Sequence, residues 1–359
     1  MRLESGGALG EHKAMDNFDT LTAKPWLSGP TRQHFVPRFY LEGFSSSGWL
    51  SVFDRVSGKL RKQRPKNVAV VSNLYTFEDK YDRKRFDLEV LFSQIESAAA
   101  PILKSLTEGK RISAEQRETF AVFIGLAAVR TPAAIAETSG VYEEFVKANS
   151  FLTMTDEEKI FNDLVNMKGV DADHSLLREQ AGRLAKMARE GTYDVQIDKG
   201  YARSRSLKVM ETIARAILTR DWMILHAASE EQFFLTSDSP VILLPTSTAA
   251  RNHPIGYSSP HAQVLLPLSS KSALVASGTL GRTGHCNVET EKLHRFNLAV
   301  AEHCHKHVFG ADEMLLESIT TELGLAGTVW KPKMTVKIER FMRSDGSTSS
   351  GATVTRKGI

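Results

Sequence analysis

The chain has 359 residues, of which 42% are hydrophobic and 25% are charged. This is the composition of a globular protein, so wholesale disorder is excluded and a sizeable core can form in one large domain or two smaller ones. Two cysteines, Cys286 and Cys304, exclude a disulfide scaffold and are consistent with a reducing cytosol. The net charge of +4 is mildly basic, so its distribution says more about partners than its sum.

The ends of the chain differ in composition from the rest. Residues 1–30 are rich in Gly, Ser and mixed charge and predict a flexible amino-terminal lead, whereas the Ser-, Gly- and Thr-rich residues 341–359 predict a flexible tail. The first 20 residues lack the apolar core of a secretory signal. No run of about 18 apolar residues occurs, so we expect a cytoplasmic protein without a membrane span.

Strand patterns come first after the lead. Residues 49–53 alternate in part, residues 56–59 give a turn signal, and a basic strand is predicted at 60–64, which together indicate a hairpin. A further short strand is predicted at residues 74–77.

Helices dominate the middle of the chain. Apolar residues at helical spacing predict a helix over 86–106, which Pro101 is expected to bend or end. Residues 113–116 form a capping box that opens the next helix, and Arg130 marks its end before Pro132. Helical patterns then continue to about residue 219.

The remainder returns to strands with two helices, and this segregation predicts the α+β class. We expect strands near both ends to form one mixed or antiparallel sheet, in a single domain over 31–340 with a helical insertion at about 86–219. The later strands are predicted at 222–227, 233–236, 241–244, 262–268, 272–276 and 334–338, and the helices at 289–303 and 313–323.

The strongest local signal is the run Gln33-His34-Phe35-Val36-Pro37, which is followed by Arg38, Phe39, Tyr40 and Leu41. It resembles the hallmark of a bacterial family called domain of unknown function 4238, in which Tyr usually stands where this chain has Phe35. Weaker matches extend the resemblance over most of residues 31–310, at Asn73–Tyr75, Arg130–Pro132, Thr236–Pro240 and Asn297. The resemblance implies an architecture and a set of residues, and no particular activity.

His34 is the first candidate for chemistry. A histidine with a near-neutral pKa and a cation four residues later, at Arg38, suits general acid–base catalysis or a phosphate contact. The alternative is a histidine that bonds to backbone where the chain enters the domain.

Glu89 and Glu96 are seven residues apart, so two helical turns place them on one face. Paired carboxylates could hold a divalent metal such as magnesium or manganese, or share acid–base roles. The alternative is a solvated helix face on which Arg85 pairs with Glu89.

Three further polar residues are candidates: Arg130 and Asn297 lie on apolar helix faces, and Asp238 lies in a turn after a hydrophobic strand. Arg130 must be paired if it is buried, and it could clamp a phosphate or simply lie at a helix C-terminus. Asp238 either places an active-site carboxylate at a strand end or builds a turn. Asn297 either anchors a neighbouring loop or faces a polar pocket with His34 or Arg130.

Several known site types are not indicated. The pairs and clusters of His and Cys at 285–286 and 303–307 fit no standard zinc finger. The sequence contains no phosphate-binding loop, dinucleotide fingerprint, zincin motif or hydrolase nucleophile elbow.

Basic residues concentrate between positions 32 and 67, where eight Lys or Arg stand against two acidic residues. With interleaved aromatic residues, a basic hairpin can follow phosphates and stack bases. Alternatively, the same side chains protect an edge strand from aggregation. The predicted nucleic-acid-binding residues are Arg55, Lys59, Arg61, Lys62, Arg64 and Lys66.

These observations favour an enzyme that cleaves RNA or DNA. His34 would be the acid or base, Arg38 and Arg130 would stabilise phosphate charge, and Glu89, Glu96 or Asp238 would orient the base or hold a metal. The alternatives are a non-catalytic module that binds nucleic acid or a nucleotide, and a structural or sensor protein. A role in bacterial defence or as a toxin is a further hypothesis that comes from the resemblance alone.

Overall fold

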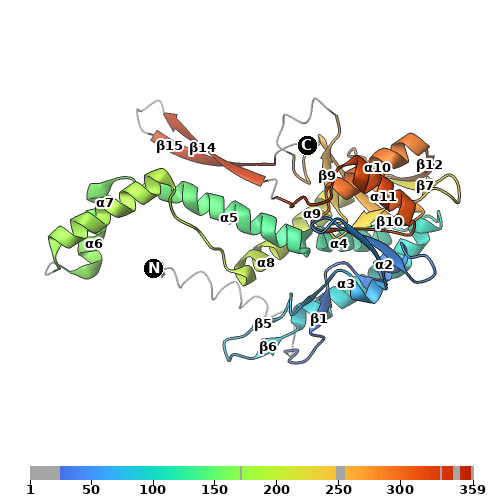
Figure 1. Ribbon diagram of the computed structural model, residues 1–359, viewed down its shortest axis with the longest axis horizontal. Coiled ribbons are helices and arrows are strands. Elements are labelled where there is room, and N and C mark those ends of the chain that lie inside the picture. Colours follow the sequence, from blue (N-terminus) through green and yellow to red (C-terminus); the bar gives the residue numbers. More distant parts are fainter. Residues whose placement is uncertain (1–24, 170–171, 248–254, 332–333, 343–347, 357–359) are drawn as a thin grey trace.

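The computed structural model describes residues 25–169, 172–247, 255–331, 334–342 and 348–356. Strands from both ends of the chain flank a helical middle, so the predicted α+β class is confirmed (Figure 1). Most of the predicted flexible lead, residues 1–24, lies outside the described residues.

The amino-terminal motif forms a short strand and a helix. β1 (Arg32–His34) pairs antiparallel with β4 (Val70–Ser72), and α2 (Arg38–Glu42) begins directly after Pro37. Proline suits this position because its fixed φ is compatible with the start of a helix and its missing N–H is not needed there. The other elements of this part are β2 (Leu50–Asp54), β3 (Lys59–Gln63), the 3-10 helix η1 (Pro65–Asn67), β5 (Phe77–Glu78) and β6 (Lys84–Arg85).

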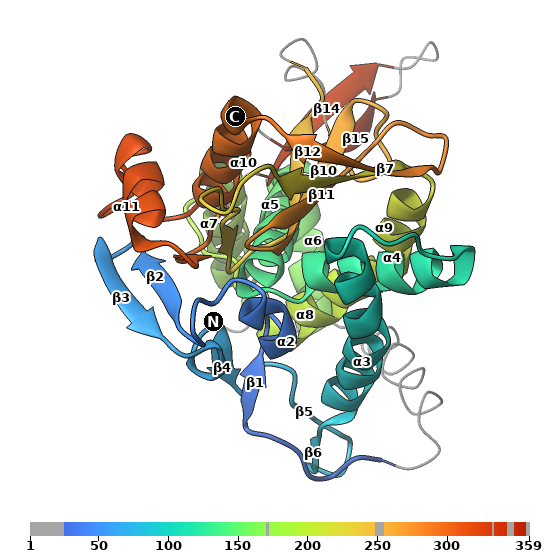
Figure 2. The ribbon, with the colours of Figure 1, turned by 90° about the vertical axis from the view of Figure 1, so that its right-hand side faces the viewer.

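One sheet joins the two ends of the chain. Its order is β3-β2-β13-β8, in which β8 is Thr236–Ser237 and β13 is His307–Gly310, and every pair is antiparallel. The predicted hairpin is confirmed as β2 and β3. β3 is the edge strand of this sheet (Figure 2). Its basic residues Lys59, Arg61 and Lys62 are exposed.

A second sheet has five strands in the order β12-β7-β11-β10-β9. β12 runs parallel to β7 and the other pairs are antiparallel, so this sheet is mixed. The sequence did not predict β12, because its Gly284 and its polar residues interrupt the apolar alternation. The strands are β7 (Asp221–Ala227), β9 (Ile242–Pro245), β10 (Ala262–Ser269), β11 (Ser272–Ser277) and β12 (Thr283–Val288).

The helix α3 carries the candidates Glu89 and Glu96, and α4 ends directly before Arg130. α3 spans Asp87–Thr107, close to the predicted 86–106, and Pro101 lies inside it without ending it. The capping box that opens α4 (Ala114–Val129) is present in both directions between Ser113 and Gln116. The remaining helices of the body are α8 (Lys199–Lys208), α9 (Met210–Leu218), α10 (Thr290–Glu302) and α11 (Glu313–Glu322).

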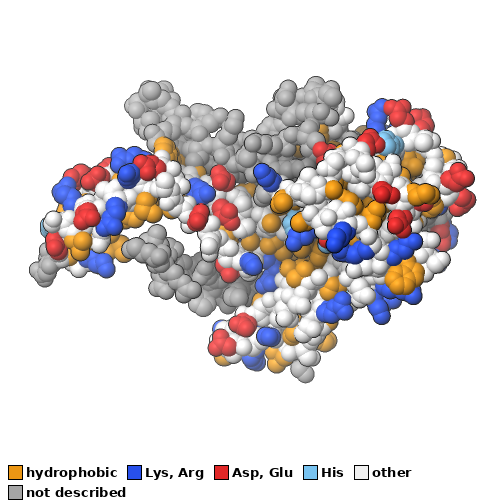
Figure 3. All heavy atoms as spheres, in the orientation of Figure 1, with side chains coloured by type: hydrophobic (Ala, Val, Ile, Leu, Met, Phe, Trp, Pro, Cys, Tyr) orange, Lys and Arg blue, Asp and Glu red, His pale blue; other side chains and the backbone are white. Residues whose placement is uncertain are grey.

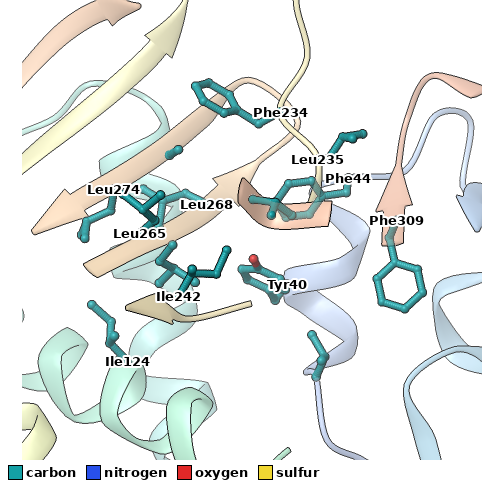
Figure 4. Close-up of a cluster of buried hydrophobic side chains, with 14 of the residues drawn as sticks. Tyr40, Phe44, Ile124, Phe234, Leu235, Ile242, Leu265, Leu268, Leu274 and Phe309 are labelled. Atoms are coloured by element: carbon teal, nitrogen blue, oxygen red, sulfur yellow. The ribbon is translucent and has the colours of Figure 1, made fainter. Parts of the chain in front are cut away.

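The main core lies between the five-stranded sheet and the helices. In Figure 4, Leu265 and Leu274 of the sheet lie above Ile124 of α4 and Tyr40 of α2. The fully buried Tyr40 hydroxyl donates a hydrogen bond to the carbonyl oxygen of Pro267 at 2.7 Å and shares one with Thr236 Oγ1 at 2.8 Å. This phenol therefore ties α2 to both sheets.

A long arm extends from the body (Figure 1). It begins with α5 (Pro132–Thr153) and ends in the paired helices α6 (Glu157–Lys168) and α7 (His174–Glu190), which have a small core of their own around Phe161 and Ala181. No single described helix is long and apolar enough to cross a membrane, although α4 and α5 together meet that test as a pair bent by 64°.

The carboxyl-terminal part contains more regular structure than the sequence predicts. β14 (Met334–Met342) includes the predicted strand and pairs with β15 (Thr348–Arg356), which lies within the predicted flexible tail. The predicted strand at 74–77 is largely a turn, and only Phe77 of it belongs to β5.

We expect the variant Tyr40→Phe to lose about 1–3 kcal/mol of unfolding free energy, because it leaves the buried Thr236 hydroxyl and Pro267 carbonyl without a partner. Chemical denaturation would measure the loss. The matched control is Tyr81→Phe, whose side chain is 64% exposed and which should change little. Equal stability of the two variants would contradict the role of Tyr40.

Candidate active site

Gln33 holds the amino-terminal motif in place. Its side chain is fully buried, and its Nε2 donates to Thr76 Oγ1 at 3.0 Å and to the Pro30 carbonyl at 3.2 Å. Its Oε1 accepts the backbone N–H of Tyr75 at 2.7 Å. This amide therefore clamps the turn that contains Tyr75 against β1, which explains why the turn does not form the predicted strand.

Tyr75 extends this connection to α4. Its buried hydroxyl donates to the carbonyl oxygen of Arg130 at 2.7 Å, and its ring meets that of Phe92 edge-on with centroids 4.9 Å apart. From α8, Arg203 Nη1 donates to the carbonyl oxygen of Leu74 at 2.6 Å. The position of the Arg130 backbone is thus fixed from the amino-terminal part of the chain.

Arg130 is only 1% exposed and is the charged centre of the cluster. Its Nε donates to the carbonyl oxygen of Phe35 at 3.0 Å, and its Nη1 forms an ion pair with Glu96 Oε1 at 2.6 Å. A buried guanidinium needs such partners, as the sequence argument anticipated. Its Nη2 has no hydrogen-bond partner among the described residues.

Glu89 and Glu96 both belong to α3 and differ in environment. Glu96 is held by Arg130, whereas burial raises the pKa of Glu89 to about 7, an effect to which the charge of Glu96 adds and which Arg130 opposes. Arg85 does not pair with Glu89 as the alternative reading expects. It binds both oxygens of Asp87 instead, at 2.7 and 2.8 Å.

His34 lies at the end of β1 and is half-buried. Burial lowers the pKa of its ring, Arg32 and Arg130 lower it further, and Glu96 and the Pro65 carbonyl act in the opposite direction. Its Nε2 is buried without a hydrogen-bond partner among the described residues. The ring is therefore mainly neutral at pH 7 and retains a nitrogen that can exchange a proton.

The structure thus brings together His34, Glu89, Glu96 and Arg130 from three separate segments. A neutral imidazole and a carboxyl group that titrates near neutrality are a candidate base and acid, because each is poised close to physiological pH. The free Nη2 of Arg130 and the free Nε2 of His34 are covered in this conformation, so a substrate would reach them only after a local displacement.

The other predicted catalytic residues are bound elsewhere. Arg38 is exposed and pairs with Glu42 at 2.8 Å. The buried Asp238 accepts the backbone N–H groups of residues 305, 306 and 307 at 2.8–3.0 Å. Asn297 accepts from the N–H of Leu235 and donates to the carbonyl of Phe233, both at 2.9 Å, which corresponds to the loop-anchoring alternative.

The predicted nucleic-acid-binding residues divide into two groups. Arg55 is engaged in the fold, since it donates to Thr328 Oγ1 and to the Cys304 carbonyl, both at 2.8 Å. The others are exposed, where Arg61 lies 3.5 Å from Asp54, Lys62 lies 3.2 Å from Glu313 and Arg64 covers the ring of Trp49. The exposed group is Lys59, Arg61, Lys62, Arg64 and Lys66.

No group of three or more His, Cys, Asp or Glu side chains suited to a metal occurs within the described residues. Of the paired carboxylates, one oxygen of Glu96 is bound to Arg130. Nδ1 of His285 lies 3.0 Å from Nε2 of His226, and both residues belong to the five-stranded sheet.

Together these features define a partly buried acid–base cluster on an α+β scaffold. A family model described as protein of unknown function (DUF4238) matches residues 32–314, which include the motif, both glutamates and Arg130. Because the match covers most of the chain, the chain belongs to this family. No curated protein and no solved structure matches it.

The raised pKa of Glu89 has a measurable consequence for stability. The folded state holds this proton more tightly than the unfolded state, whose pKa is near 4.5, so the contribution of Glu89 to stability should fall as pH rises from 4.5 through about 7. With allowance for solvent screening of a partly exposed group, Glu89→Gln should be more stable than wild type by about 1–2 kcal/mol at pH 8.5 and similar at pH 4.5.

Denaturant unfolding across this pH range tests the expectation. The exposed Glu118→Gln, on α4, is the control and should show the same difference from wild type at every pH. A constant difference for Glu89→Gln as well would contradict the raised pKa.

Proposed function

We propose that this protein is a nucleic-acid-cleaving enzyme that uses His34 and Glu89 as a general base and a general acid. The observation that carries the proposal is the presence, beside the buried Arg130, of a neutral imidazole and of a carboxyl group whose pKa is about 7. Because the pKa of His34 is lowered and that of Glu89 is raised, His34 suits the proton-accepting role and Glu89 the proton-donating role.

RNA is the substrate that this chemistry suits best, because its 2′-hydroxyl supplies the nucleophile within the substrate. His34 Nε2 would take the 2′-hydroxyl proton as that oxygen attacks phosphorus. The carboxyl proton of Glu89 would pass to the departing 5′-oxygen as the P–O bond breaks, which leaves a cyclic phosphate and a free hydroxyl. Arg130 would be a positioning residue, since its guanidinium holds Glu96 and helps to keep His34 neutral.

The basic edge strand supports a polyanionic substrate. β3 carries Lys59, Arg61 and Lys62 and leads through Arg64 to η1, whose Pro65 carbonyl lies beside the His34 ring. Arg32, two positions before His34 in the sequence, donates from Nη2 to Asn67 Oδ1 at 3.4 Å, and Asn67 belongs to η1. In Figure 3 several Lys and Arg side chains, interspersed with acidic ones, lie on the right-hand part of the surface, where Figure 1 draws the blue amino-terminal part of the chain around α2. A phosphate backbone could therefore follow the strand toward His34.

The direct test is cleavage of end-labelled single-stranded RNA, beside single-stranded and plasmid DNA, with and without magnesium or manganese. We expect His34→Gln to lower the rate by about 100-fold or more, the usual effect of losing a general base. The wild-type rate should decline as pH falls through the lowered pKa of His34 and as pH rises above about 7, where Glu89 loses its proton.

Two variants separate catalysis from binding and from folding. Arg38→Gln lies outside the cluster and should cleave normally, whereas Arg61→Gln combined with Arg64→Gln should raise KM with little change in kcat. Salt-sensitive binding without cleavage would favour the non-catalytic binding module. If His34→Gln folds normally and cleaves at the wild-type rate, the acid–base assignment is wrong.

A further inference from the structure

A cavity of about 540 Å³ lies on the other side of the α4–α5 junction from the acid–base cluster. Its walls come from the end of α4, the first turns of α5, α8, α9 and the segments 239–243 and 255–259. Ala127, Ile213 and Ile242 are among the many aliphatic side chains that line it, so most of the wall is apolar. The volume is within the range of cavities that hold small organic ligands.

One cation stands in this apolar wall. Arg205 of α8 lies against the rings of Tyr201 and Tyr142, with its guanidinium carbon 4.9 and 6.0 Å from their centroids. No hydrogen bond or ion pair reaches this guanidinium from any residue that the structure describes, so its N–H groups remain available to an anion. An arginine that is packed against aromatic rings loses little further mobility when it binds such a group.

A second polar group in the wall also lacks a partner. The hydroxyl oxygen of Ser239 is buried and forms no hydrogen bond within the described part of the chain. A buried hydroxyl without a partner is uncommon and suggests that a ligand or a water completes it. Glu137 lines the cavity as well, so the charge of the wall is not uniformly positive.

We infer that this cavity is a binding site for a small amphipathic anion, an apolar ring or chain that carries a single carboxylate, sulfonate or phosphate. The anionic group would bind Arg205, the apolar body would cover the aliphatic wall, and a polar atom of the ligand would bond to Ser239. An ion pair that is shielded from water by an apolar wall is stronger than one in water. Burial of the ligand's apolar body adds to the binding free energy.

This site is separate from the proposed catalytic cluster. Val129 and Thr131 line the cavity, while the guanidinium of Arg130 between them binds Glu96 and the Phe35 carbonyl. Ligand binding can therefore be measured whether or not the protein cleaves nucleic acid, and failure of one proposal leaves the other untouched.

The test uses 8-anilinonaphthalene-1-sulfonate, a fluorescent amphipathic anion, and its uncharged analogue N-phenyl-1-naphthylamine. We expect saturable binding of the sulfonate with one equivalent per chain. Arg205→Gln should raise the Kd of the sulfonate by about tenfold or more, the loss of one charge-assisted contact, and leave that of the neutral analogue nearly unchanged.

Two more variants locate the binding site. Ala128→Phe, which fills the cavity from α4, should weaken both probes, and Lys208→Gln, an exposed cation on the same helix as Arg205, should weaken neither. Circular dichroism would establish that each variant is folded. Sulfonate binding that is absent, unsaturable or unchanged in Arg205→Gln would overturn the inference.

Discussion

The need of one buried guanidinium for partners organises the region around the amino-terminal motif. A charged group that is removed from water is tolerated only when other groups replace its hydration, and Arg130 obtains that replacement from Glu96 and the Phe35 carbonyl. Its backbone carbonyl is held in turn by Tyr75, and Tyr75 by Gln33. β1, α3 and the α4–α5 junction are therefore joined through a single side chain and its supports.

The same guanidinium contributes to the proton affinities nearby, where burial has the largest effect. It forms an ion pair with Glu96, and it opposes protonation of His34. Glu89 lies two helical turns from Glu96 and meets both burial and a like charge, so its carboxyl group keeps a proton up to about pH 7. The buried charge of Arg130 serves the fold and would serve the proposed catalysis equally. The structural and the catalytic roles of the cluster differ only in whether Nε2 of His34 reaches a substrate.

The sequence predicted a considerable part of this arrangement. Apolar periodicity located α3 and α4, helical spacing paired Glu89 with Glu96, and a charge on an apolar helix face identified Arg130. It could not assign Gln33 and Tyr75, because their importance comes from partners more than 40 positions away along the chain. Spacing alone grouped Arg38 with His34, yet α2 begins at Arg38 and turns that side chain into solvent.

Local sequence patterns were least reliable for polar residues whose hydrogen-bond partners are backbone groups far away along the chain. Asn297 looks like a site residue because it is polar on an apolar helix face, and Asp238 because it lies in a turn after a hydrophobic strand. Their partners are backbone groups of segments that approach only in the folded chain, at 305–307 and at 233–235. The opposite error affects Arg205 and Ser239, which the sequence did not identify as site residues, because a cavity has no signature in composition or periodicity.

The central claim is that His34 belongs to one electrostatic unit with Glu96 and Arg130. An NMR titration of the His34 ring nitrogens measures this directly, in wild type and in Glu96→Gln. The account predicts a wild-type pKa below 6.5 and a lower pKa in the variant, because the substitution removes the larger of the two effects that oppose burial and leaves only the Pro65 carbonyl. A pKa at or above 6.5 that is unaffected by the substitution would contradict it.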